Sequence, residues 1–226
     1  MIGLISAMDS EIDLLRSAMT DRREEVRAGS TFYLGKIDGV EVVLVSCGVG
    51  KVNAAVHTQI LIDFYHPVAI IQSGVAGALS PKLKIFDVVV GDVLVYHDMQ
   101  DFILESFDSL QKAYCADPAL VRLAADVAET AIVGKITSGD VFVSDDETKR
   151  VIAEKTGALC VEMEGAAVAH TAHLNNVPFV VIRVISDTAD ADPELVFAVF
   201  EKAAAMNSAK ITRDMLPRIE KVLSER

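Results

Sequence analysis

The stretch NVPFVVIRVISDTAD, residues 176–190, decides the fold class of this chain. Residues 179–184 are apolar and rich in β-branched side chains on both faces, with Arg183 as the exception. Such a run predicts a strand that is covered on both sides, as in the parallel sheets of α/β proteins. Ser186 and Asp187 follow the run, and a helical pattern comes after them. A covered strand that leads into a helix predicts helices packed on a central sheet.

The same alternation continues along the whole chain. The predicted strands are 2–6, 31–37, 40–46, 68–72, 87–90, 93–96, 132–137, 158–161 and 179–184. The predicted helices are 9–19, 51–64, 118–129, 144–155, 165–174 and 193–224. Asp38-Gly39 separates two strands and is a hairpin signal, so the sheet should be mixed. No linker, repeat or low-complexity tract divides the chain. We predict one α/β domain over residues 1–226, with three layers and a mixed central sheet flanked by helices.

The composition narrows the class of protein. Hydrophobic residues make up 51 % of the 226 residues and charged residues 24 %, enough for a sizeable core and unlike a disordered chain. No apolar run reaches the ~18 residues that a bilayer span requires. The formal net charge of −12 argues against binding of nucleic acid or an anionic membrane through bulk electrostatics. The expected ligand is therefore a small molecule.

Compartment and cofactors can also be predicted. The N-terminal MIGLISAMDSE carries acids where a signal peptide carries basic residues, and it predicts a first strand. The cysteines, Cys47, Cys115 and Cys160, are scattered and odd in number, which is typical of reduced thiols in a cytoplasmic protein. The five histidines have no metal-ligand spacing, and we predict neither a metal nor a cofactor.

Polar or small residues follow six of the predicted strands. They occupy positions 7–11, 47–50, 73–77, 138–140, 162–164 and 185–187. Ligands of open α/β sheets bind beyond the carboxyl ends of the strands. The sequence therefore predicts a site at one edge of the sheet, built from these six segments.

The glycine-rich segment SCGVGKVNAA, residues 46–55, has two interpretations. It resembles half of a dinucleotide fingerprint, but Asn53 stands at the third glycine position, and the spacing of a P-loop is absent. A tight turn that needs glycine is favoured. A dinucleotide-dependent dehydrogenase is therefore the least favoured function.

Charged residues around the last strand also allow more than one interpretation. Arg183 lies in an apolar strand and needs a carboxylate or an anionic ligand, for which Glu11 and Glu164 are candidates. Asp190 and Asp192 could belong to a metal cluster, but N-capping of the C-terminal helix is favoured for Asp192.

The segment VEMEGAAVAH, residues 161–170, carries two glutamates one residue apart and completes a set of motifs. The other motifs are IGLISAMDSEIDLL (2–15), GVGKVNAA (48–55), IIQSGVAGAL (70–79), DVVVGDV (87–93) followed by YHD (96–98), SGDVFV (138–143) and NVPFVVIRVISDTAD (176–190). In this order they resemble the nucleoside phosphorylase/nucleosidase superfamily, and most closely the bacterial 5′-methylthioadenosine/S-adenosylhomocysteine nucleosidases. The resemblance implies a nucleoside phosphorylase-like fold and hydrolysis of the N9–C1′ bond of a 5′-thio-substituted adenosine, which releases adenine.

The resemblance also implies catalytic roles. Asp187 would be the general acid that protonates adenine N7, oriented by Ser186. Glu11 would position and deprotonate the attacking water, with Arg183 nearby. Glu164 would bind the ribose hydroxyls and stabilise the positive charge that the sugar develops.

Further residues would form the substrate pocket. Met163 would lie beside the sugar, Phe142 would stack on adenine, and the backbone of Val143 would contact the edge of the base. The apolar walls near the sugar and the 5′ group would be Met8, Val49 and Phe197. Small residues after a strand, Val75, Ala76 and Gly77, would line the pocket floor, although a tightly packed turn is an equal alternative for them.

Two alternatives to a hydrolase stay open. A phosphate-dependent purine nucleoside phosphorylase is disfavoured because Gln72 stands where phosphorolytic relatives carry an arginine, and because the carboxylate of Glu11 would repel phosphate but can activate water. A non-catalytic nucleoside-binding protein is disfavoured because ligand binding alone would not require Glu11, Glu164 and Asp187 together.

One segment departs from the resemblance. After YHD, close relatives carry a longer stretch rich in glycine, proline and aromatic residues, whereas this chain has a shorter segment at 99–117. The 5′-substituent is therefore undetermined, with 5′-deoxyadenosine and aminofutalosine as further possibilities. Phe102 and Phe107 in this segment, together with the resemblance, predict a homodimer.

Overall fold

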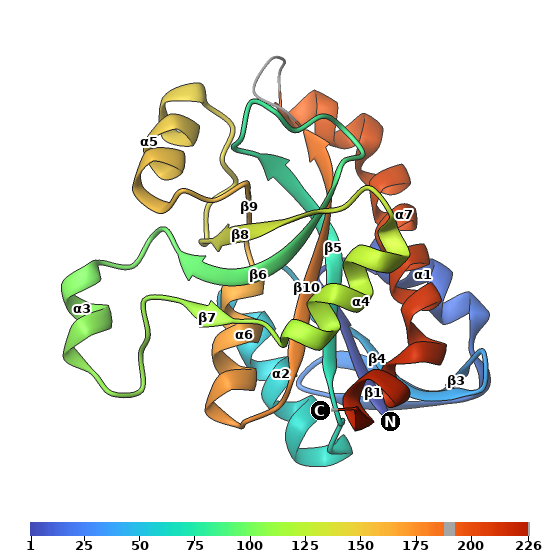
Figure 1. The fold of residues 1–226 in the computed structure, drawn as a ribbon. Helices are drawn as coiled ribbons and strands as arrows, with labels where there is room; N and C mark the ends of the chain where they lie inside the picture. Colours follow the sequence, from blue (N-terminus) through green and yellow to red (C-terminus); the bar gives the residue numbers. More distant parts are fainter. Residues whose placement is uncertain (188–192, 226) are drawn as a thin grey trace.

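The computed structural model describes residues 1–187 and 193–225 and is organised around one mixed sheet. The strands are β1 (Ile2–Ser6), β2 (Thr20–Arg27), β3 (Ser30–Ile37), β4 (Val40–Ser46), β5 (Ile70–Ala78), β6 (Val88–Tyr96), β7 (Tyr114–Cys115), β8 (Ile132–Ser138), β9 (Cys160–Glu162) and β10 (Phe179–Asp187). They follow the order β10-β6-β8-β9-β5-β1-β4-β3-β2, and β7 pairs with β6. Because β10 also pairs with β5, the strands β10, β6, β8, β9 and β5 close into a ring, and β1, β4, β3 and β2 extend from it as an open sheet (Figure 1).

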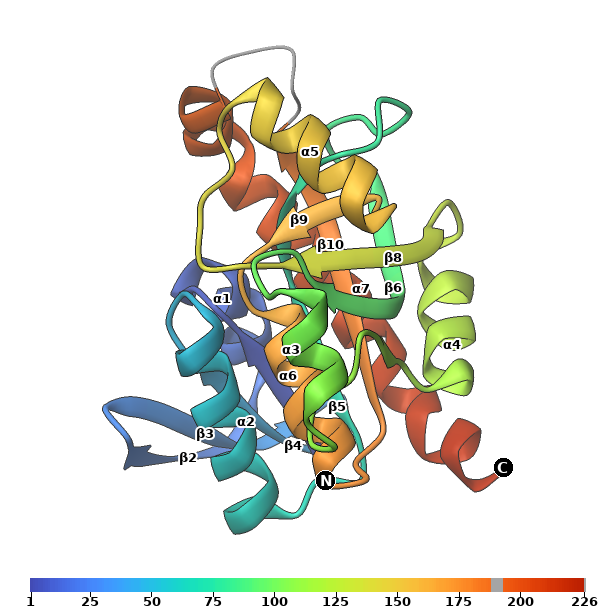
Figure 2. The ribbon, with the colours of Figure 1, turned by 90° about the vertical axis from the view of Figure 1, so that its left-hand side faces the viewer.

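Helices cover both faces of this sheet, which gives the predicted three layers (Figure 1). The helix α7 (Pro193–Ser224) packs against α1 (Asp9–Ala18) and α4 (Pro118–Ala128) on one face. On the other face, α2 (Lys51–Tyr65) packs against α6 (Gly165–Leu174). Figure 2 shows α5 (Asp146–Thr156) across the end of the strand ring, and Figure 1 shows α3 (Asp101–Ser106) standing away from the sheet.

The direction of the strands gathers the predicted segments at one edge. The strands β1, β4, β5 and β10 run parallel, so their carboxyl ends meet there. The short strand β9 runs antiparallel to β5, but it pairs with the last residues of that strand, Val161 opposite Gly77. Residues 162–164 therefore reach the same edge, where the ligand sites of α/β sheets lie.

Several predicted elements differ from the structure. Strand β2 was not predicted because its sequence TDRREEVR lacks an apolar pattern; it is an exposed edge strand held by its pairing with β3. The short elements α3 and β7 were also missed. Predicted strands 87–90 and 93–96 are one strand, β6, which continues through an irregularity after Gly91.

Two strands are longer than predicted, and both extend into the site. Strand β5 includes residues 73–77, and β10 includes residues 185–187, which we expected to follow the strands. Both strands are almost wholly buried and have neighbouring strands on either side. Their small and polar residues are therefore held in the extended conformation by backbone hydrogen bonds. The predicted cap at Asp192 lies outside the described residues.

Candidate active site

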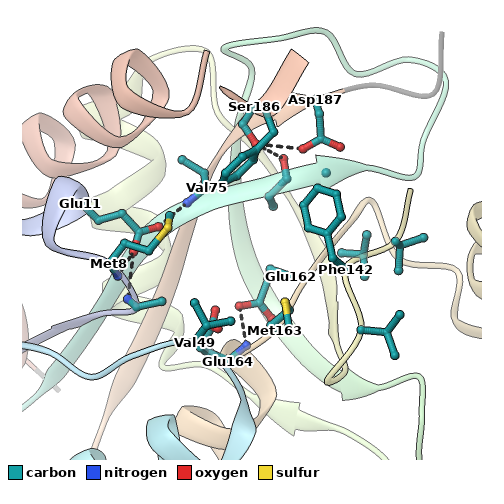
Figure 3. Close-up of a pocket in the computed structure, with 17 residues that line it drawn as sticks. Met8, Glu11, Val49, Val75, Phe142, Glu162, Met163, Glu164, Ser186 and Asp187 are labelled. Atoms are coloured by element: carbon teal, nitrogen blue, oxygen red, sulfur yellow. Dashed lines mark hydrogen bonds between the residues drawn. The ribbon is translucent and has the colours of Figure 1, made fainter. Parts of the chain in front are cut away.

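A cavity of about 380 Å³ opens at the edge where these strand ends meet (Figure 3). Thirteen predicted site residues line it: Met8, Glu11, Val49, Val75, Ala76, Gly77, Phe142, Val143, Met163, Glu164, Ser186, Asp187 and Phe197. Ala7 and Glu162 also line it, from the predicted segments 7–11 and 162–164, although neither was given a role of its own; Val141 and Val161 line it from outside those segments. Arg183 is fully buried and contacts carboxylates of the site without lining the cavity.

The carboxyl groups lie on different sides of this cavity. Figure 3 shows Glu11 on one side, Asp187 on a second and the pair Glu162 and Glu164 on a third. All four are almost inaccessible to solvent. A ligand in the cavity would therefore meet a separate carboxyl group on each of three sides.

Glu11 is held at the start of α1 by backbone N–H groups. One carboxylate oxygen accepts hydrogen bonds from the N–H groups of Ala7 and Met8, both at 2.9 Å, and the other accepts one from Val75 at 3.0 Å. Burial nevertheless raises the pKa of Glu11, while the charge of Arg183 and the three N–H donors act in the opposite direction. The result is a fixed carboxylate with more proton affinity than an exposed one.

Gly74 allows Glu11 and Arg183 to approach each other. A Cβ atom at Gly74 would collide with the carboxylate of Glu11 and the guanidinium of Arg183. Both side chains therefore occupy the space above the bare backbone of β5. Gly74 is therefore required because two side chains pack closely against it, and not because the chain turns there.

Glu162, at the end of β9, is bonded to several neighbouring residues of the site. It forms a buried ion pair with Arg183 and accepts a hydrogen bond from the Ser138 hydroxyl. It also accepts from the N–H groups of Glu164, at 3.1 Å, and Gly165, at 2.8 Å, at the N-terminus of α6. A negative charge is favourable at this end of a helix. Every bond formed by Glu162 therefore fixes the orientation of neighbouring site residues.

Glu164 occupies the N-cap position of α6, but its side chain forms no capping hydrogen bond and lines the cavity instead. Its Oε1 accepts a hydrogen bond from the N–H of Gly50 at 2.8 Å, and its Oε2 lies 3.6 Å from Arg183. Burial and then the charge of Glu162 raise its pKa to about 7, although Arg183 and the Gly50 N–H lower it. The glycine turn after β4 thus donates a backbone N–H to a carboxylate of the site.

Asp187 ends β10, and its two carboxyl oxygens have different partners. The Ser186 hydroxyl donates to Oδ1 at 3.0 Å, and the ammonium of Lys149 lies 3.9 Å from Oδ2. Burial raises the pKa of Asp187, while the hydroxyl and the ammonium lower it. A carboxyl group with a raised pKa can carry a proton to a bound ligand.

The remaining walls are apolar. Phe142 and Phe197 meet edge to face, with ring centroids 5.7 Å apart. Val49 and Phe142 are partly open to solvent, at 50 % and 41 % exposure, so the cavity has an apolar mouth. A flat, apolar ligand group fits beside such rings.

Comparisons with known proteins agree with this geometry. The model of the phosphorylase superfamily matches residues 1–217. The chain belongs to the phosphorylase superfamily. It is 37 % identical to a 5′-methylthioadenosine/S-adenosylhomocysteine nucleosidase of Geobacillus thermodenitrificans, with 96 % of this chain and 97 % of the relative aligned. For the nucleosidase of the same name in Staphylococcus carnosus the identity is 39 %, with 96 % and 99 % aligned.

Solved structures of the superfamily confirm the predicted fold. An S-adenosylhomocysteine nucleosidase of Streptococcus pyogenes, in complex with 5-methylthiotubericidin, has a TM-score of 0.91 at 35 % identity and covers 96 % of both chains. A futalosine hydrolase of Helicobacter pylori has a TM-score of 0.90 at 32 % identity and covers 96 % of this chain and 97 % of its own. The predicted nucleoside phosphorylase-like architecture is therefore correct.

This member of the superfamily has site features that the sequence analysis missed. Lys149 was overlooked because its helix, DETKRVIAEKT, is polar, yet Lys149 and Ile152 are its buried residues. Their spacing of three marks one inward face and was the available signal.

In residues 1–187 and 193–225, no group of His, Cys, Asp or Glu could hold a metal ion. No helix in that part of the chain could cross a bilayer.

Proposed function

We propose that this chain hydrolyses the N-glycosidic bond of 5′-methylthioadenosine and S-adenosylhomocysteine and releases adenine. The carrying observation is the placement of Glu11, Glu164 and Asp187 on three sides of one buried, largely apolar cavity. Breaking an N-glycosidic bond requires a proton on the base, a water at C1′ and stabilisation of a positively charged sugar. The three carboxyl groups match these three requirements.

Each carboxyl group has the environment that its role needs. Asp187, with its raised pKa and its hydroxyl partner, gives a proton to N7 of adenine. Glu11, fixed by three N–H donors, orients the water and accepts its proton as the C1′–O bond forms. Glu164, held by Gly50, binds the ribose hydroxyls and opposes the positive charge at the sugar. The bonding electrons leave with adenine.

The lining of the cavity favours water over phosphate as the nucleophile. Among the described residues, no Lys, Arg or His side chain lines the cavity, and the nearby Arg183 is paired with Glu162. Gln72, where phosphorolytic relatives carry an arginine, is fully buried. A phosphate there would face buried carboxylates without a cation, which is unfavourable.

The quaternary state and compartment belong to the same proposal. Phe102 and Phe107 of the 99–117 segment are 63 % and 59 % exposed, which supports a homodimer with this face covered. One hydrophobic core extends from Ile2 to Ile219, which supports a single domain. Free thiols at Cys47, Cys115 and Cys160 support a cytoplasmic location.

Product analysis tests the proposal. The purified chain is incubated with 5′-methylthioadenosine in phosphate-free buffer and in buffer with phosphate, and the products are separated by chromatography. We expect adenine and methylthioribose at the same rate in both buffers. Formation of methylthioribose 1-phosphate only with phosphate would make the chain a phosphorylase, and absence of turnover in both would make it a binding protein.

A further inference from the structure

Lys149 is a buried cation that the proposed mechanism does not yet use. It lies on α5, and its side chain is 4 % exposed. Its ammonium has no hydrogen-bond acceptor among residues 1–187 and 193–225. A lysine in such a place is unfavourable unless a charge nearby repays its desolvation. The described charge near it is Asp187, whose Oδ2 is 3.9 Å from Nζ.

The position of Lys149 relative to the cavity is informative. Asp187 lines the cavity, and Lys149 does not. Lys149 therefore contacts the proposed general acid without contacting the ligand space. The Ser186 hydroxyl occupies Oδ1, whereas the 3.9 Å distance to Oδ2 is too long for a hydrogen bond and leaves that oxygen able to carry a proton.

We propose that Lys149 is a positioning residue that stabilises the carboxylate of Asp187 formed when this residue protonates the leaving base. This inference rests on the proposed hydrolysis. In that step the proton moves from Oδ2 of Asp187 to N7, the C1′–N9 electron pair goes to adenine, and water supplies the new C1′–O bond. Asp187 thereby becomes negative in a buried place. The ammonium attracts the carboxylate more strongly than the protonated carboxyl group, so its effect is larger in the transition state than in the bound substrate.

Of the described residues around Asp187, Lys149 is the one that brings a positive charge to it. Ser186 of β10 and the small residues Ala76 and Gly77 of β5 bring no charge to the cavity. Glu11 and Glu164 line the same cavity, but on other sides (Figure 3). Within the described part of the chain, Lys149 is the cation paired with Asp187. Asp190 and Asp192 lie outside the described residues.

The test compares Lys149→Met with the wild type in the full-length protein. Methionine keeps an unbranched side chain and removes the charge. We expect kcat for 5′-methylthioadenosine to fall at least roughly tenfold near neutral pH, with KM changed by less than about threefold. The pKa of Asp187 should rise without the ammonium, so the alkaline limb of the pH–rate profile should move to higher pH.

Arg150→Met is the matched control. It removes the same charge from the next residue of α5, but Arg150 is exposed and pairs with Glu154 at the surface. We expect wild-type kcat and an unmoved alkaline limb. Lys149→Arg, which restores a cation, should recover part of the lost rate. If Lys149→Met does not fold by circular dichroism, Lys149→Gln gives the same comparison.

A second substrate separates this inference from the proposed function. A 5′-methylthioriboside with a nitrophenolate leaving group needs no proton from Asp187, so Lys149→Met should cleave it within about threefold of the wild type. Equal losses with both substrates, or an unmoved alkaline limb, would reduce Lys149 to a packing role and overturn the inference. Failure of the wild type to release adenine would instead overturn the proposed function.

Discussion

At the scale of single residues, one chemical group is given several roles by its surroundings. Glu11 accepts three backbone N–H bonds, Glu164 accepts one and lies near Arg183, and Asp187 accepts one hydroxyl and lies near Lys149. Burial raises the pKa of all three. In the proposed function, the number of donors and the nearby charge distinguish Glu11 as a fixed base, Glu164 as a sugar-binding group and Asp187 as a proton carrier.

Asp187→Asn tests the proton carrier. Asparagine keeps the shape and the hydrogen bond from Ser186 but has no proton to give. General acid catalysis contributes ~10²–10⁴-fold, so we expect kcat to fall by at least that factor while 5′-methylthioadenosine still binds. Single-turnover kinetics and equilibrium binding measure the two quantities. Near-normal turnover would remove Asp187 from the mechanism.

Glu164→Gln tests the raised pKa of a buried carboxyl group. The pKa of Glu164 is about 7 in the folded protein against an ordinary value of 4.5. Between these values the folded protein holds a proton that the unfolded chain has lost, so this group's contribution to stability falls as pH rises from about 4.5 to about 7. The free energy of unfolding of Glu164→Gln, relative to that of the wild type, should therefore increase between pH 4.5 and pH 7, by on the order of 1–3 kcal/mol.

Urea titrations at several pH values measure this difference. Glu220→Gln, which changes an exposed glutamate of α7, is the control and should follow the wild type at every pH. A constant offset for Glu164→Gln, or a trend of opposite sign, would contradict the pKa shift.

At the scale of elements, the apolar pattern predicted which segments form the sheet but not where the strands end. Strands such as β1 and β10 are buried on both faces, so their sequences carry the signal strongly. The residues 73–77 and 185–187 contain serine, glycine and aspartate, which propensity assigns to loops. Pairing between β5 and β10, and of Gly77 with β9, keeps them extended. The edge strand β2 depends on its neighbour in the same way.

The site, like the sheet, was predicted in part from the sequence. The apolar pattern located the strand ends at which several cavity segments lie, whereas residues such as Phe142 and Phe197, which lie in a loop and in α7, were predicted only through the family resemblance. Sequence could not reveal that Glu162 and Arg183 are partners, since they come from β9 and β10 and meet only in the folded chain. It could not reveal Lys149 for the same reason: burial of one polar side chain on a polar helix depends on the packing of α5 over the ring.

Gly74→Ala tests whether Glu11 and Arg183 need the space above the backbone of β5. The added methyl group would collide with Glu11 and Arg183, so we expect a lower melting temperature and at least tenfold lower kcat. Gly3→Ala in β1 is the control, because its methyl group would lie 3.3 Å from the side chains of Ile70 and Pro67 and needs only a small shift. Equal effects of the two substitutions would show that Gly74 has no special place in the site.

At the scale of the whole molecule, exposed apolar side chains call for a partner. Phe102 of α3 and Phe107, which directly follows it, are exposed, and α3 stands away from the body of the chain (Figure 1). We expect sedimentation equilibrium to give a dimer at micromolar concentration. The double substitution Phe102→Ser and Phe107→Ser should weaken it by removing apolar area from the contact. A wild-type monomer under these conditions would mean that both rings remain solvent-exposed.

The substrate range is decided by the apolar mouth of the cavity. Met8, Val49 and Phe197 line it, and no cation does within the described residues. Burying a 5′-phosphate there would leave its charge unpaired at a cost of several kcal/mol, so AMP should not be cleaved. Burial of a methylthio group gains about 0.8 kcal/mol for each of its two heavy atoms. We therefore expect kcat/KM for 5′-methylthioadenosine to exceed that for adenosine by at least roughly tenfold.

The same measurement with S-adenosylhomocysteine and aminofutalosine tests the 99–117 segment. The zwitterionic end of homocysteine must stay hydrated, so this nucleoside is a substrate only if the segment leaves the mouth open, as the exposure of Val49 and Phe142 indicates. We expect cleavage of S-adenosylhomocysteine at a rate between those for adenosine and 5′-methylthioadenosine. Aminofutalosine as the best substrate of the set would show that this segment has changed the 5′ pocket. Efficient cleavage of AMP would show that a cation reaches the mouth from a partner subunit.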